Sequence, residues 1–214
     1  CLKNPIVFLK GVRLGEWNTS SDPDCDEGQC SDAVVNIPVV EQIPHEKYEP
    51  NSRLQLNDIA LLRLARPVQY TNWIKPIPLP TVSDVNKNFD GVPLIASGWG
   101  TTEHAARSDI KLKVKLNGTS LDKCNVLYSG YGVTLTNLHL CAGGEKGKDS
   151  CKGDNGGPLI HENKSDPKNV QYSIVGVASF GSSPCGLKDV PGVYTRVDQY
   201  IDWISNHMNK QENR

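Results

Sequence analysis

The sequence predicts an all-β protein with one helix at its C-terminus. Fourteen prolines and 19 glycines are spread along the 214 residues and divide the chain into short pieces. This composition favours turns and short strands over long helices. Several short apolar runs lie between polar or proline-containing segments, and one run near the end has helical spacing instead. The length suffices for one sizeable core, or for two small cores that share an interface.

Five strands and one helix follow from these patterns. One segment alternates Leu, Val and Leu with lysines, which is the period of a strand with one buried face. The predicted strands are residues 34–40, 59–64, 111–116, 173–178 and 192–197. The predicted helix begins at Asp198 as its N-cap and aligns four apolar residues on one face. These four are Val197, Ile201, Ile204 and Met208.

Charge and hydropathy argue against two classes of partner. The chain has 23 basic and 24 acidic residues, with no basic stripe and no polybasic helix. Nucleic acid and the membrane surface are therefore not expected partners. No run of about 18 apolar residues exists that could span a bilayer.

The cysteines and sequons indicate a secreted protein in an oxidising compartment. Three Asn-x-Ser/Thr triplets, at Asn18, Asn117 and Asn163, are glycosylation acceptors. No CxxC pair or Cys/His cluster has zinc spacing. The cysteine count is odd, and the start carries neither Met nor a signal sequence, so we expect an internal fragment. The seven cysteines are Cys1, Cys25, Cys30, Cys124, Cys141, Cys151 and Cys185.

The most specific motif is the stretch 149–159, Asp-Ser-Cys-Lys-Gly-Asp-Asn-Gly-Gly-Pro-Leu. Asn-Gly alone is a common turn dipeptide, but the whole string resembles the nucleophile loop of the chymotrypsin/trypsin family of serine proteases. Asn155 then stands at the position of the catalytic serine. Its neutral amide has no hydroxyl that a base could activate. The resemblance makes Gly153, with the N–H of residue 155, an oxyanion hole, and Asp154 the acid that pairs with a new N-terminal amine.

A second block, residues 57–64, begins with the predicted catalytic acid. A lone Asp58 before a strand is usually a turn residue, but the block resembles the one that holds the aspartate orienting the catalytic histidine. That histidine precedes the family's equivalent of Cys1, so the resemblance places it upstream of this sequence. His45 is a poor substitute, because its segment lies on the barrel exterior in the family.

Three further segments, 97–100, 179–181 and 191–195, occur in the family's order. They imply a specificity pocket with Asp149 at its base, lined by Ser179, Gly181 and Gly192. A buried carboxylate in a narrow slot favours Arg or Lys side chains. The implied fold is two six-stranded antiparallel β-barrels, the first truncated, at about 1–82 and 83–196, and a helix at about 197–209.

The resemblance also implies the disulfides Cys25–Cys30, Cys124–Cys141 and Cys151–Cys185, with Cys1 left over. His161 and Leu94 stand where trypsin has a further pair. A narrower resemblance, carried by residues 12–17 and the loop 25–30, is to the clip-domain proteases of arthropod haemolymph. Pro78 stands where those proteins keep a tethering cysteine.

The acidic loop raises the possibility of a structural calcium ion; no other cofactor is expected. Hard cations prefer six to eight oxygen ligands, and carboxylates are dense here. The alternative is a solvated acidic loop. The candidate ligands are Glu16, Asp22 and Asp26, with Asp24 and Glu27 nearby.

Three functions are open. The favoured one is a catalytically silent protease homologue that binds cascade proteins outside the cell, with the upstream segment of its own chain as a further partner. The alternative is an active Arg/Lys-directed endopeptidase whose histidine lies upstream and whose Asn155 is a variant or a sequence error. A purely structural β-domain is disfavoured by the pocket motif. Asn155 discriminates between the first two, because truncation does not explain it.

Overall fold

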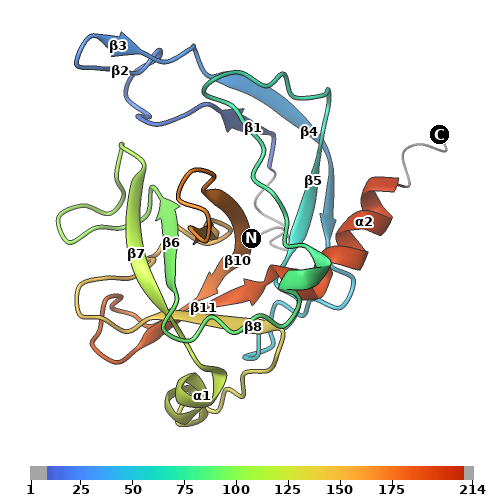
Figure 1. The fold of residues 1–214 in the computed structure, drawn as a ribbon, viewed down its shortest axis with the longest axis vertical. Coiled ribbons are helices and arrows are strands. Elements are labelled where there is room, and N and C mark those ends of the chain that lie inside the picture. Colours follow the sequence, from blue (N-terminus) through green and yellow to red (C-terminus); the bar gives the residue numbers. More distant parts are fainter. Residues whose placement is uncertain (1–8, 210–214) are drawn as a thin grey trace.

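Six antiparallel strands close into a barrel in the second half of the chain (Figure 1). The computed structural model describes residues 9–209 and orders these strands β10-β11-β8-β7-β6-β9. The helix α1 (Leu121–Ser129) lies outside the barrel between β7 and β8. The barrel strands are β6 (Pro93–Gly98), β7 (Leu112–Thr119), β8 (His139–Gly143), β9 (Pro158–Asn163), β10 (Gln171–Phe180) and β11 (Pro191–Arg196).

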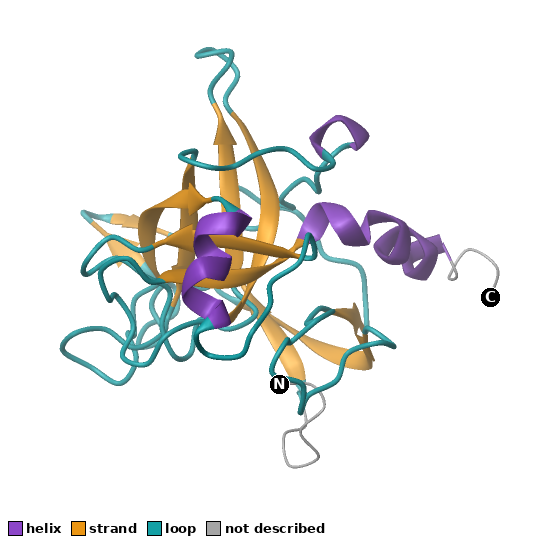
Figure 2. Ribbon diagram, turned by 90° about the horizontal axis from the view of Figure 1, so that it is seen from below, coloured by secondary structure: helices purple, strands orange, loops and turns teal. Residues whose placement is uncertain are grey.

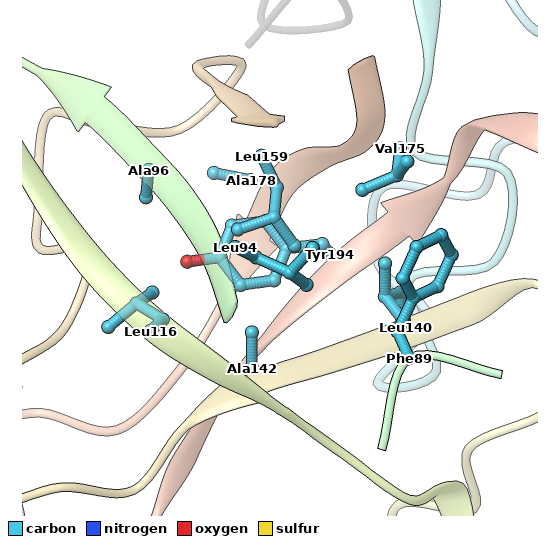
Figure 3. Close-up of a cluster of buried hydrophobic side chains, with 10 residues drawn as sticks. All are labelled: Phe89, Leu94, Ala96, Leu116, Leu140, Ala142, Leu159, Val175, Ala178 and Tyr194. Atoms are coloured by element: carbon cyan, nitrogen blue, oxygen red, sulfur yellow. The ribbon is translucent and has the colours of Figure 1, made fainter. Parts of the chain in front are cut away.

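The barrel encloses an apolar core, shown in Figure 3. Leu94, Leu116 and Leu159 are at most 1% exposed, because alternate residues of their strands face inward. The ring of Tyr194 fills the centre, and its hydroxyl donates to Ser150 Oγ at 2.9 Å. The core thus reaches the loop that follows Asp149. The buried members are Phe89, Leu94, Ala96, Leu116, Leu140, Ala142, Leu159, Val175, Ala178 and Tyr194.

The first part of the chain forms a smaller sheet beside the barrel (Figure 1). Its strands are β1 (Gly11–Leu14), β4 (Val35–Pro44) and β5 (Ala60–Leu64), in the order β1-β4-β5. Within the described residues, β1 and β5 are therefore its edges. A hairpin of β2 (Cys25–Asp26) and β3 (Gln29–Cys30) projects from one end and is closed by Cys25–Cys30.

The C-terminal segment differs from its prediction at both ends. A 3₁₀ turn, η2 (Val197–Tyr200), precedes α2 (Ile201–Asn209). Asp198 is not an N-cap: it accepts from the N–H of Asn86 and from Arg196 instead. Met208 is 61% exposed because α2 projects away from the body at that end (Figure 2). A further 3₁₀ turn, η1 (Val82–Asp84), lies between β5 and β6 in the sequence.

The fold class predicted from the sequence is confirmed. Each predicted strand overlaps an observed one, namely β4, β5, β7, β10 and β11. The second barrel is closed, whereas the described part of the first half forms the three-stranded sheet and the β2–β3 hairpin and no closed barrel. The disulfides match the expected pairs, and Cys1 lies outside the described residues. No helix in residues 9–209 is both long and apolar enough to cross a membrane.

Candidate functional site

The loop between β8 and β9 is shaped by the half-buried carboxylate of Asp154 and by glycines. Asp154 accepts from the N–H of Gly100 at 2.8 Å and of Cys151 at 2.9 Å. A Cβ on Gly98 would lie 2.1 Å from Asp154 Oδ1, so the glycines of the 97–100 turn leave room for this carboxylate. Gly153 has φ +103°, a conformation that only glycine adopts readily.

Asn155 is held against the neighbouring strand. Its Nδ2 donates a hydrogen bond to the Ser179 carbonyl. The next rungs are backbone bonds, from Gly156 N to Ala178 O at 2.8 Å and from Ala178 N to Gly157 O at 2.9 Å. The side-chain amide thus extends the pairing of β9 with β10 by one rung. Within the described residues, the N–H groups of Gly153 and Asn155 have no acceptor, as an oxyanion hole requires.

Ser179 connects Asn155 to Asp58. The Ser179 hydroxyl donates to Asp58 Oδ2 at 2.6 Å, while its carbonyl accepts from Asn155. Thr195 Oγ1 donates to the Asp58 carbonyl at 2.8 Å. Asp58 precedes β5 of the small sheet, whereas Ser179 and Thr195 belong to the barrel. The site therefore spans the junction of the two halves of the fold.

Asp149 presents an uncompensated carboxylate oxygen. Its Oδ2 accepts from Gly186 N at 2.9 Å, but its Oδ1 is buried and has no partner within residues 9–209. Burial raises the pKa of Asp149, because desolvation disfavours the charged form. A Cβ on Gly192 would lie 3.1 Å from Oδ1, and one on Gly181 would lie 3.7 Å from Gly192 Cα. Because Gly181 and Gly192 have no side chain, space remains beside the Asp149 oxygen that lacks a partner.

The expected calcium site gains no support. No group of three His, Cys, Asp or Glu side chains within the described residues could hold a metal ion. Glu16 pairs with Arg13 at 2.9 Å, and Asp22 Oδ1 accepts from Val34 N. Asp24 accepts from the N–H groups of residues 17 and 18, so it orders the loop itself. Glu16 Oε1 is buried without a partner, but a single such oxygen falls far short of a calcium shell.

Three histidines, His45, His139 and His161, make their ring contacts with residues outside the loop 149–157. His45 packs on the rings of Tyr200 and Trp203, consistent with the exterior position expected for it. His161 pairs with Leu94 across β9 and β6, so the two positions without the family's cysteines do face each other. His139 is buried, and sequence reasoning gave it no role.

Two site contacts were not predicted. Thr195 lies within a motif block, but nothing in that motif indicated its bond to the Asp58 carbonyl. The N–H of Gly186 reaches Asp149 because the disulfide Cys151–Cys185 brings these loops together. Such a contact depends on the path of two loops, and no local sequence pattern encodes it.

Comparison with known proteins finds matches over most of the chain. The protein-family model described as Trypsin matches residues 17–204. Melanization protease 1 of Drosophila melanogaster is 49% identical over 206 residues, covering 94% of this chain and 51% of that protein. CLIP domain-containing serine protease HP8 of Bombyx mori is 47% identical over 197 residues, covering 92% and 53%. The chain spans about half the length of these curated relatives.

A solved structure shares the fold as well. The crystal structure of the Drosophila Grass clip serine protease of the Toll pathway superposes with a TM-score of 0.78 at 34% identity. The match covers 94% of this chain and 57% of that one.

Proposed function

This chain belongs to the trypsin family, and from that membership we propose that it is a catalytically silent homologue that acts by binding. The observation that carries the proposal is Asn155, whose amide occupies the nucleophile position and bonds to the Ser179 carbonyl. An amide cannot be activated as a serine hydroxyl can. Loss of the nucleophile alone costs a serine protease roughly 10⁶-fold in turnover.

The ligand we propose is a protein segment that presents Arg or Lys. Asp149 Oδ1 is buried without a partner, and Gly181 and Gly192 leave space beside it. A guanidinium or ammonium group would offset the desolvation of this carboxylate. Asn155 does not contact Asp149 in any hydrogen bond of the described residues, so binding and catalysis are separable here.

We further propose an extracellular place in a proteolytic cascade. The relatives named Melanization protease 1 and Grass clip serine protease of the Toll pathway support this class of role. Cascade proteins are then the partners, and the open edges of β1 and β5 suit pairing with an upstream segment of the same protein. The proposal includes no cofactor, and calcium is not part of it because no group of three His, Cys, Asp or Glu side chains in residues 9–209 could hold a metal ion.

An active Arg/Lys-directed endopeptidase is the second candidate. The bond from Ser179 to Asp58 and the free N–H groups at Gly153 and Asn155 are features that an active relative would need. Many of the similar proteins are also named as proteases. This candidate requires a histidine from outside the present sequence and a serine at position 155.

The test compares the Asn155 protein with Asn155→Ser, both in the longest native form and after activation cleavage. We expect the Asn155 form to bind benzamidine without hydrolysing arginine esters or amides, and the serine variant to gain turnover. Benzamidine binding is followed by calorimetry and hydrolysis by chromogenic release.

The outcomes separate the candidates. Hydrolysis by the Asn155 form would refute the silent homologue and support the endopeptidase. Silence of both forms, with benzamidine bound, would place the defect beyond residue 155. Absence of benzamidine binding to the Asn155 form would refute the proposed ligand class.

A further inference from the structure

His139 lies at the start of β8 and forms a bridge between the two halves of the site. It is 3% exposed. Its Nε2 lies 3.0 Å from the Leu54 carbonyl, in the segment that precedes Asp58. Its ring meets Phe180 edge-on, with centroids 6.2 Å apart. Phe180 follows Ser179 and precedes Gly181, so one imidazole touches both segments that build the site.

The hydrogen bonds of this imidazole specify one protonation state. Thr136 N donates to Nδ1 at 3.0 Å, so Nδ1 is an acceptor. Nε2 faces a carbonyl and must therefore carry the proton. Burial lowers the pKa of His139, which agrees with a neutral ring. The neutral Nε2–H tautomer satisfies both bonds, whereas any other form leaves one donor facing a donor or one acceptor facing an acceptor.

The segment that His139 contacts needs external support. Gln55 and Asn57 have φ of 45° and 60°, which are unfavourable for residues with side chains. The Leu54 side chain packs against a buried cluster between α1 and the barrel that includes Tyr128 and Val133, with Phe180 beside it. This segment is thus held on that cluster at Leu54, only four residues before Asp58.

We propose that His139 is a positioning residue that fixes the Leu54–Asp58 segment against the Phe180 ring and thereby shapes the surface bound by a peptide beyond the pocket. The imidazole acts through its Nε2–H bond to Leu54 and not through its local bond to Thr136. The effect on peptide binding rests on the proposed function, whereas the placement of residues 54–58 by His139 does not.

Two substitutions separate the contributions of the two hydrogen bonds that the His139 ring forms. In His139→Asn the side-chain oxygen replaces Nδ1 and retains the bond from Thr136 but loses Leu54. In His139→Gln the terminal NH₂ replaces Nε2 and retains the bond to Leu54 but loses Thr136. His104→Asn, at an exposed histidine, is the matched control.

The first readout is amide hydrogen exchange of residues 54–58 in the 214-residue chain. We expect exchange there to be about tenfold faster in His139→Asn, the effect of losing about one buried hydrogen bond, and near wild type in His139→Gln. The second readout is affinity for a tetrapeptide ending in arginine amide, relative to benzamidine. His139→Asn should weaken the peptide about tenfold while leaving benzamidine within about twofold.

Equal exchange and equal peptide affinity in His139→Asn and wild type would overturn the proposal, as would equal damage in both His139 variants. If wild type binds neither benzamidine nor peptide, the proposed function fails, and the exchange data alone decide the inference. If neither His139 variant folds, ¹⁵N chemical shifts of the wild-type ring provide the test. The Nε2–H tautomer at neutral pH supports the proposal, and the Nδ1–H or doubly protonated form overturns it.

Discussion

Asn155 and Asp149 lie in one loop but act on different properties of the site. Asn155, which we propose stands at the nucleophile position, bonds to the Ser179 carbonyl and would affect chemistry. Asp149 is a half-buried carboxylate whose Oδ1 has no partner within residues 9–209, so we expect it to affect which side chain can enter. A chain can lose the first property and keep the second, because no hydrogen bond of the described residues joins these two side chains directly.

We predict that Asp149→Asn weakens benzamidine binding by about 10- to 150-fold, the range for a hydrogen bond to a charged group. In the wild type, affinity should also fall on acidification, because only the ionised carboxylate binds a cation. Burial raises the pKa of Asp149 above its ordinary value of 3.8, so this loss begins at a higher pH than for an exposed aspartate.

Calorimetric titrations of benzamidine at several pH values check this prediction. Asp189→Asn, at an exposed aspartate of a nearby loop, is the control and should leave affinity unchanged. A pH-independent affinity in the acid range would contradict the assignment of Asp149 as the cation-binding group.

At the scale of elements, the sequence pattern was informative where burial has a regular period. The alternation of lysines with apolar residues in β7 and the apolar run of β5 both appear as strands. The helix α1 was missed because its nine residues include charged and β-branched positions without a clear apolar face. It is held instead by buried Cys124, bonded to Cys141, and by Tyr128, whose hydroxyl donates to the Pro191 carbonyl.

The motif residues of the site could be located in the sequence, but their contacts could not. Asp58 is 121 positions from Ser179, so their bond depends on how the sheet and the barrel meet. Asn155 is 24 positions from Ser179 and bonds to its backbone carbonyl, which no side-chain pattern in the sequence indicates. The calcium expectation gained no support for a similar reason. Carboxylate density is visible in a sequence, whereas the donors that already satisfy Asp22 and Asp24 are not.

The 97–100 turn offers a test at this scale. We predict that Gly98→Ala destabilises the chain by about 3 kcal/mol or more, because the new Cβ would lie 2.1 Å from Asp154 Oδ1 and displace a carboxylate that accepts two backbone bonds. Gly91→Ala is the control: its φ is +73° but its Cβ would meet no atom within 4 Å, so backbone strain of about 1 kcal/mol is expected.

Urea unfolding of both variants measures the two costs. Similar losses for Gly98→Ala and Gly91→Ala would show that the Asp154 carboxylate can move aside. That result would contradict the view that these glycines exist to accommodate it.

At the scale of the whole molecule, two sets of contacts join the two halves of the fold: one at the C-terminal helix and one at the site. The 3₁₀ turn η2 and α2 pack Val197, Tyr200 and Ile204 against Leu61 of β5 and Ile59 just before it. On the site side, Asp58 is bonded to Ser179 and Thr195, and Leu54 to His139. The free energy of unfolding and the site geometry therefore depend on the same junction. A pH change that alters the stability of this junction should also alter the site.

We predict that the free energy of unfolding decreases as pH is lowered through 6.5. Burial lowers the pKa of His139 and of His161 below 6.5, the value at which they protonate in the unfolded chain. Between these values the unfolded chain binds more protons than the folded one, so acidification favours unfolding. Each histidine contributes at most about 1.4 kcal/mol per pH unit. Asp149, with its raised pKa, acts in the opposite sense at lower pH.

Urea unfolding at about pH 7.5 and about pH 5.5 measures this slope, and substitution assigns it to residues. The double variant His139→Gln with His161→Gln removes both groups and should flatten the dependence between these pH values. His104→Gln, at an exposed histidine, should leave it unchanged. If the double variant kept the full slope, the loss of stability would have to come from carboxylates instead. If His139→Gln alone removed most of it, the buried bridge to Leu54 would be the main pH-dependent contact of the junction.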